Sequence, residues 1–208
     1  LATQQQLEFA DFAALHAFSV KHRDVFWRAV IDFCGVIYHQ EAECDLIDEG
    51  HMIEAKWFKG MTLNFAENLL KHQGDDTAIV FESESAKVRS MSFNELRSKV
   101  AQVQQKLKAC GIRQGDRVAG FMPNIPETIV MMLATTSLGG VWSSTSPDFG
   151  INGVVDRFGQ IAPKVLFSVN GYEYNGKTHD CLAKVEQIVA QIDSIEHTVI
   201  VDFVAQDA

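Results

Sequence analysis

The stretch from Gly115 to Gly150 constrains the fold of this chain more than any other. It reads GDRVAGFMPNIPETIVMMLATTSLGGVWSSTSPDFG. A short apolar run at 117–122 is followed by Pro126, a residue favoured in the first turn of a helix. An apolar segment then ends at two glycines, and a second apolar run begins at Val141. The order strand, helix, strand is typical of a crossover unit in a parallel sheet.

The same alternation continues on both sides of this stretch. Upstream, Ser92 and Glu95 have the spacing of a capping box, and Gly111 stands where a helix C-cap is expected. Downstream, Asp148 can cap a helix that begins near Ile151. The other expected elements are a strand pair at 77–82 and 88–91, a strand at 164–169, a helix through 182–192 and a strand at 198–203. The sequence therefore predicts an α/β fold with a mainly parallel sheet and helices on both faces.

The first 60 residues differ from the rest and predict a helical N-terminal extension, followed by an α/β region over 61–208. Apolar residues recur at helical spacing within 9–20 and again within 25–33. The acidic segment 41–54 predicts a solvated loop, with a functional acidic patch as the alternative. Ala55–Leu70 is expected to be a loop that leads into a short helix.

Composition excludes several classes of protein. The net charge is −9, which disfavours general binding to nucleic acid or to anionic membranes. No apolar run approaches the ~20 residues of a membrane span. Four widely spaced cysteines predict free thiols in a reducing compartment, and hence a cytoplasmic protein. The chain starts without an initiator methionine or a signal-peptide pattern, so we expect it to lie within a longer reading frame.

The usual catalytic and metal-binding motifs are not found. The sequence has no GxGxxG motif after its first strand, no GxxxxGK[ST] loop and no GxSxG elbow. Its seven histidines form no ligand pattern, so no metal site and no catalytic residue is predicted. Cys181 opens a predicted helix, where a thiol can have a lowered pKa; the alternative is a packed small residue.

Two segments remain as candidate binding sites, because each follows a predicted parallel strand and so lies at the sheet edge where open α/β sheets bind ligands. Trp142–Gly150 supplies the hydroxyls of Ser143, Ser144 and Thr145; the alternative is a Ser/Thr-rich turn. Asn170–Thr178 carries two tyrosines and Lys177 ahead of a helix, a setting suited to phosphate. The alternative there is an ordinary exposed loop.

Three segments together resemble the acyl-CoA synthetases of the adenylate-forming superfamily. They are WFKGMTLNFAENLL, the Gly115–Gly150 stretch and NGYEYNGKTHD. The likeness is greatest to the branch that ligates acetoacetate, because Trp142 and Pro147-Asp148 depart from the loop of the acetyl branch. It covers about 55–203 and identifies the α/β region as the first, truncated subdomain of the adenylate-forming N-terminal domain.

The resemblance implies a ligase that uses ATP, Mg²⁺ and CoA to activate acetoacetate or another short acyl acid. The alternatives are an acetyl- or propionyl-type synthetase, a non-catalytic CoA- or nucleotide-binding module, and a scaffold domain. The superfamily's catalytic loop is not found through Ala208. We therefore expect a fragment that is inactive alone and holds no tightly bound cofactor.

The resemblance also assigns binding roles. Lys177 falls on the second of two cations that contact the CoA nucleotide phosphates in the acetyl branch, and Tyr174 falls near the first. Ser143, Ser144 and Thr145 would line the pantetheine tunnel. The last strand of the sheet leaves an open edge, which predicts self-association of the chain.

Overall fold

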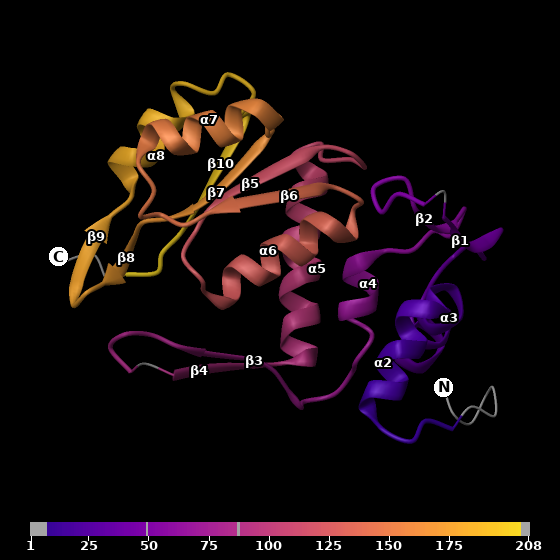
Figure 1. The fold of residues 1–208 in the computed structure, drawn as a ribbon. Helices are drawn as coiled ribbons and strands as arrows, with labels where there is room; N and C mark the ends of the chain where they lie inside the picture. Colours follow the sequence, from indigo (N-terminus) through magenta and orange to yellow (C-terminus); the bar gives the residue numbers. More distant parts are fainter. Residues whose placement is uncertain (1–7, 49, 87, 205–208) are drawn as a thin grey trace. The chain divides into compact units, whose positions relative to one another are not determined.

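The computed structural model describes residues 8–48, 50–86 and 88–204 (Figure 1). The chain divides into two compact units, Leu1–Asn64 and Phe65–Ala208. Each unit is described by itself.

The first unit contains two helices and a small antiparallel sheet. Helix α2 (Phe12–Lys21) is capped by Asp11, whose carboxylate accepts a hydrogen bond of 2.8 Å from the Ala14 amide. Helix α3 (Arg23–Cys34) ends at a left-handed glycine. Both helices confirm the predicted pair. The sheet joins β1 (Cys44–Ile47) to β2 (Lys56–Lys59).

Strand β1 lies inside the acidic segment, so the prediction of a solvated loop was wrong for these residues. Four carboxylates of this segment, those of Glu41, Glu43, Asp45 and Asp48, have cationic partners. Arg28 Nε donates to Asp45 at 3.0 Å, and an Arg28 nitrogen lies 3.0 Å from Glu41. Lys59 pairs with Glu43 at 2.7 Å. Charge pairing between α3, β2 and this segment therefore allows acidic residues to be part of a strand.

The second unit is built on a four-stranded parallel sheet in the order β10-β7-β5-β6. All three neighbouring pairs in this sheet are parallel, which confirms the predicted class of fold. The strands are β5 (Arg117–Phe121), β6 (Val141–Thr145), β7 (Val165–Val169) and β10 (His197–Val201). The long helices are α5 (Phe93–Ala109), α6 (Pro126–Ser137), α7 (Ile151–Ile161) and α8 (Leu182–Val189).

Helices cover both faces of this sheet, and each face has its own apolar core (Figure 1). On one face, Val118, Val165 and Phe167 pack with residues of α5 and α6. On the other, Phe121 and Leu166 pack with residues of α7 and α8. Successive residues of one strand thus serve different cores, as the twofold repeat of a strand requires.

A separate antiparallel ribbon precedes the sheet. It pairs β3 (Thr77–Glu82) with β4 (Val88–Ser92), as predicted. Ser92 also caps α5, and both hydrogen bonds of the capping box with Glu95 are present. Gly111 follows that helix with a φ of 77°, and the expected short helix is α4 (Phe65–Leu69). The alternation from residue 88 therefore holds, except that its first strand belongs to this ribbon and not to the parallel sheet.

One predicted cap is wrong. Helix α7 begins after Gly150, and no side chain caps it, so Asp148 does not have the role expected from its position. Ser146 and Phe149 instead close a turn through their backbones, at 3.2 Å.

Close packing over Gly120 gives the first testable prediction. A Cβ placed on Gly120 would lie 2.6 Å from two ring atoms of Trp142, which packs near Phe167. We expect Gly120→Ala to lower the free energy of unfolding by about 1–3 kcal/mol, because the indole ring has to move. Urea denaturation of the chain measures this change.

The matched control is Gly159→Ala. Gly159 lies inside α7, and a Cβ there meets no atom within 4 Å. This substitution should raise stability by up to about 1 kcal/mol, since alanine favours a helix. Equal effects of the two substitutions would contradict the packing described for Gly120.

Candidate functional site

The carboxyl ends of the four parallel strands lie along the same side of the sheet, and the candidate site is built there. Thr145 ends β6, Asn170 follows β7, and Phe203 lies just beyond β10. The segment after β5 lies at the same edge and, with Tyr172 and Phe203, lines a cavity of about 160 Å³. Ligands of open α/β sheets bind at this edge, at the carboxyl ends of the strands.

Asn170 fixes the geometry of the edge. Its buried carboxamide oxygen accepts from the amides of Phe203 at 2.9 Å and Val204 at 3.1 Å, and its Nδ2 donates to the Val204 carbonyl at 2.8 Å. Its backbone amide donates to Val201, and its carbonyl accepts from Cys181. The sequence analysis placed this asparagine only in a candidate loop. A lone polar residue after an apolar strand was the one signal available.

The segment expected as a loop after β7 is a β-hairpin, so that prediction was wrong. Strand β8 (Gly171–Tyr174) pairs with β9 (Lys177–Asp180) in antiparallel register. The connecting residues Asn175 and Gly176 have φ angles of 51° and 69°. Two positive φ angles match the tight turn that Asn-Gly favours in hairpins, and this dipeptide was the overlooked signal.

The hairpin brings two predicted binding residues together. Tyr174 and Lys177 are direct partners in the register, and so are Tyr172 and His179. Directly opposed residues share a face of an antiparallel pair. The Tyr172 and His179 rings are stacked with centroids 5.1 Å apart, and the Tyr174 ring lies 6.5 Å from His179.

This face combines aromatic rings with a cation. Tyr174 is 59% exposed and Lys177 is exposed, and no ion pair joins Lys177 to any residue that the structure describes. Burial raises the pKa of the Tyr172 phenol, which keeps it a neutral hydrogen-bonding group. An exposed ring beside an ammonium can contact a base and a phosphate of a nucleotide.

The three hydroxyls of β6 do not form one cluster. Ser143 and Thr145 are opposite Ala119 and Phe121, which face the core under α7 and α8. Ser144 is opposite Gly120 and faces the other way. Only Thr145 is buried, and within the described part of the chain its Oγ1 finds no hydrogen-bond partner. A buried hydroxyl without a hydrogen-bond partner is uncommon, and this feature distinguishes Thr145 from the other two hydroxyl residues of β6.

Cys181 is a packed residue and not a reactive thiol. Its side chain is fully buried, and desolvation raises the pKa of the thiol to about 11. Of the two readings of Cys181, the lowered pKa is excluded, since burial outweighs the opposing effect of Lys184. The alternative, a packed small residue, is confirmed. All four cysteines are free thiols.

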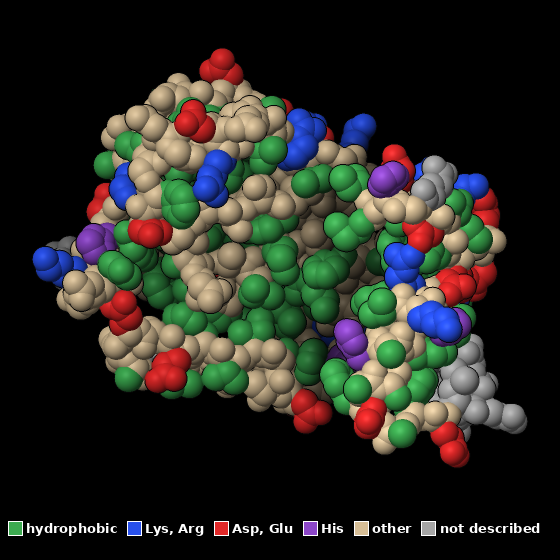
Figure 2. Space-filling view, in the orientation of Figure 1, with side chains coloured by type: hydrophobic (Ala, Val, Ile, Leu, Met, Phe, Trp, Pro, Cys, Tyr) green, Lys and Arg blue, Asp and Glu red, His purple; other side chains and the backbone are tan. Residues whose placement is uncertain are grey.

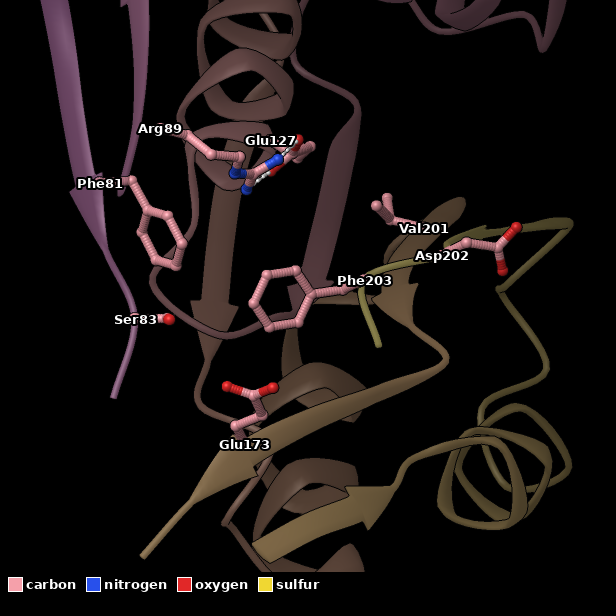
Figure 3. Close-up of a pocket in the computed structure, with 8 residues that line it drawn as sticks. All are labelled: Phe81, Ser83, Arg89, Glu127, Glu173, Val201, Asp202 and Phe203. Atoms are coloured by element: carbon pink, nitrogen blue, oxygen red, sulfur yellow. Dashed lines mark hydrogen bonds and ion pairs between the residues drawn. The ribbon is translucent and has the colours of Figure 1, made fainter. Parts of the chain in front are cut away.

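A second cavity, of about 190 Å³, lies beside the strand ends and was not foreseen (Figure 3). Arg89 on β4 donates two hydrogen bonds, of 2.9 and 3.0 Å, to Glu127 in the first turn of α6. Its guanidinium lies 5.1 Å from the Phe81 ring and 6.0 Å from that of Phe203. Figure 3 shows both rings and Glu173 around the opening.

Figure 2 shows hydrophobic side chains on the surface of the second unit where α6 and β6 lie. Among the described helices, none has both the length and the apolar character needed to cross a membrane. Residues 8–48, 50–86 and 88–204 bring together no group of three or more side chains suited to hold a metal ion.

The fold is that of an AMP-binding enzyme. The profile of the AMP-binding enzyme family matches residues 65–208, and the chain belongs to this family. The resemblance identified from the sequence is thereby confirmed.

Within this family, the chain is similar to several acetoacetyl-CoA synthetases. The chain is 47% identical to the acetoacetyl-coenzyme A synthetase of Rhizobium meliloti, over 96% of this chain and 30% of that protein. It is 40% identical to the acetoacetyl-CoA synthetase of Xenopus tropicalis, over 95% and 30%. A solved structure of acetoacetyl-CoA synthetase from Streptomyces lividans matches with a TM-score of 0.92 and 37% identity, over 100% of this chain and 32% of that one. The chain thus spans about 30% of the length of the relatives it matches.

The cysteine environments give a second testable prediction. At pH 8, iodoacetamide should label exposed Cys34 readily and leave Cys181 unmodified, because the Cys181 thiolate forms only as pH rises towards about 11. Peptide mass spectrometry after timed labelling gives both rates. The urea-unfolded chain is the control, in which both sites should react alike. Equal rates in the folded chain would contradict the burial of Cys181.

Proposed function

We propose that this chain is the N-terminal part of an ATP-dependent acid–thiol ligase that joins acetoacetate to CoA. In the first step, the acid's carboxylate attacks the α-phosphorus of ATP and pyrophosphate leaves. In the second step, the CoA thiol attacks the carbonyl of the acyl-adenylate, and AMP leaves with the bonding electron pair. The thiol proton passes to solvent.

The observation that carries this proposal is the extent of the likeness to acetoacetyl-CoA synthetases. The chain matches two acetoacetyl-CoA synthetases at 40–47% identity over 95–96% of its length. A solved acetoacetyl-CoA synthetase also has the same fold over the whole chain, and these matches together support a shared substrate. An acetyl- or propionyl-type synthetase is the alternative within the family.

Within this reaction, the chain's part is to bind CoA. Lys177 contacts a phosphate of the CoA nucleotide, and Tyr174 stacks on the adenine or hydrogen-bonds a phosphate. Ser143, Ser144 and Thr145 line the path of the pantetheine arm. The unpartnered Thr145 hydroxyl supports this, because the arm's amides offer it a hydrogen bond. No residue of the chain is proposed to be catalytic or to hold Mg²⁺, and the isolated chain holds no cofactor tightly.

The proposed partners are small molecules, namely acetoacetate, ATP and CoA. We propose a cytoplasmic protein that binds neither nucleic acid nor membranes, consistent with its acidic charge and its free thiols. Strands β10 and β6 are the outer strands of the sheet, so the isolated chain can self-associate through them.

A ligase assay tests the proposed reaction. The longer protein that contains this chain should release AMP and pyrophosphate with acetoacetate, and its kcat/KM for acetoacetate should exceed that for acetate by about tenfold or more. The 208-residue chain alone should show no acetoacetate-dependent exchange of pyrophosphate into ATP. Turnover by the isolated chain, or a preference for acetate, would contradict the proposal.

Calorimetry tests the CoA contact. Lys177→Ala should raise the Kd of the chain for CoA by about tenfold, since an ammonium–phosphate hydrogen bond is lost. Lys99→Ala, which removes an exposed lysine of α5, is the control and should leave the Kd unchanged. Equal Kd values for all three proteins would overturn the role of Lys177. Binding of CoA without ligase activity in the longer protein would favour a non-catalytic CoA module.

A further inference from the structure

The turn between Tyr174 and Lys177 is held by a distant part of the chain. The Gly176 amide donates a 3.2 Å hydrogen bond to Glu84 Oε2, and Ser85 Oγ donates one of 2.9 Å to Glu173 Oε2. Glu84 and Ser85 belong to the turn between β3 and β4. Residues of both segments, Lys177 among them, line a cavity of about 240 Å³.

The hairpin needs such a contact because its own sheet is small. Strands β8 and β9 pair only with each other among the described strands. An isolated two-stranded hairpin is marginally stable in water. Its base is fixed by Asn170 and by the buried Cys181. Its tip has no comparable core, so the two hydrogen bonds from the ribbon act where the hairpin is least restrained.

The ribbon that makes these contacts is itself firmly anchored. Its strand β4 continues into α5 through the capping box at Ser92. Arg89 binds Glu127 with two hydrogen bonds and lies over Phe81 and Phe203 (Figure 3). Glu127 lies in the first turn of α6, where a carboxylate is favoured by the helix dipole. The ribbon is therefore a support attached to the sheet core at one end and to the hairpin turn at the other.

We propose that Glu84 and Ser85 are positioning residues that hold the β8–β9 turn, and with it Tyr174 and Lys177, in the orientation that receives the CoA nucleotide. The identity of the ligand in this inference rests on the proposed function. The claim that Glu84 and Ser85 hold the turn does not depend on that function. Glu84 acts as a hydrogen-bond acceptor for a backbone amide. Its negative charge, close to Lys177, opposes phosphate binding and is not the feature that the site uses.

Substitutions at Glu84 separate the two properties of its carboxylate. Glu84→Ala removes both acceptor and charge, whereas Glu84→Gln keeps a carbonyl acceptor and loses the charge. We expect water exchange of the Gly176 amide, measured by NMR on the 208-residue chain, to become about fivefold faster in Glu84→Ala. In Glu84→Gln it should stay within about twofold of the parent chain.

Glu82→Ala is the matched control, because it removes the same charge from an exposed position of the same ribbon. It should leave Gly176 exchange unchanged. Three results would overturn the positioning role: unchanged exchange in Glu84→Ala, equal acceleration in Glu84→Gln, or acceleration in Glu82→Ala.

Calorimetry with CoA tests the functional part separately. Glu84→Ala should raise the Kd for CoA about threefold or more, and Glu84→Gln should restore the parent value or bind more tightly. A Kd that is higher in Glu84→Gln than in Glu84→Ala would show that the charge matters and the acceptor does not. If the parent chain fails to bind CoA, the role of Lys177 falls, and Gly176 exchange alone then decides whether Glu84 positions the turn.

Discussion

One buried side chain organises the edge of the sheet on which the site depends. Asn170 follows the central strand β7, and its carboxamide hydrogen bonds to the backbone that follows β10. Because a buried amide is costly unless it is paired, these bonds hold two strand ends in a single arrangement. The same residue is the last before β8, so its position sets where the hairpin leaves the sheet. A substitution at Asn170 would disturb both the arrangement of the two strand ends and the position of the hairpin.

The two cores on either side of the sheet explain why the hydroxyl groups of β6 do not all lie on the same face. Strand β6 alternates its side chains between them, so Ser144 faces away from Ser143 and Thr145. The hairpin reaches a core only at its base, through Tyr172, and its tip is held by hydrogen bonds with the β3–β4 turn. The binding groups are thus carried on two supports of different rigidity. Thr145 is fixed by the sheet, whereas Tyr174 and Lys177 depend on contacts with the β3–β4 ribbon.

Much of the fold could be predicted from the sequence, because local signals and the hydrophobic pattern agree. The capping box at Ser92, the proline that opens α6 and the apolar runs of β5 and β7 each favour the element that forms. Local signals did not suffice where tertiary contacts decide. Cys181 has its pKa set by burial, which its place before a helix does not reveal. Ion pairs with Arg28 and Lys59 stabilise a strand within a segment whose composition favours a loop.

The candidate site was predicted only in part. The strand-end location follows from the order of elements, and Tyr174 and Lys177 are adjacent as the register of the hairpin requires. The ribbon contacts were not predictable, since Glu84 and Gly176 are 92 positions apart and no local sequence pattern links them. Arg89 was missed for the same reason, because its partner Glu127 is 38 positions away.

The most direct test of this account is an NMR amide map of the 208-residue chain during titration with CoA. The account predicts shifts concentrated at Gly171–Asp180 and at the end of β6, with the largest changes near Tyr174 and Lys177. The β1–β2 sheet should show none. Shifts confined to other parts of the chain, or no shifts at millimolar CoA, would contradict a CoA site at the carboxyl edge of the sheet.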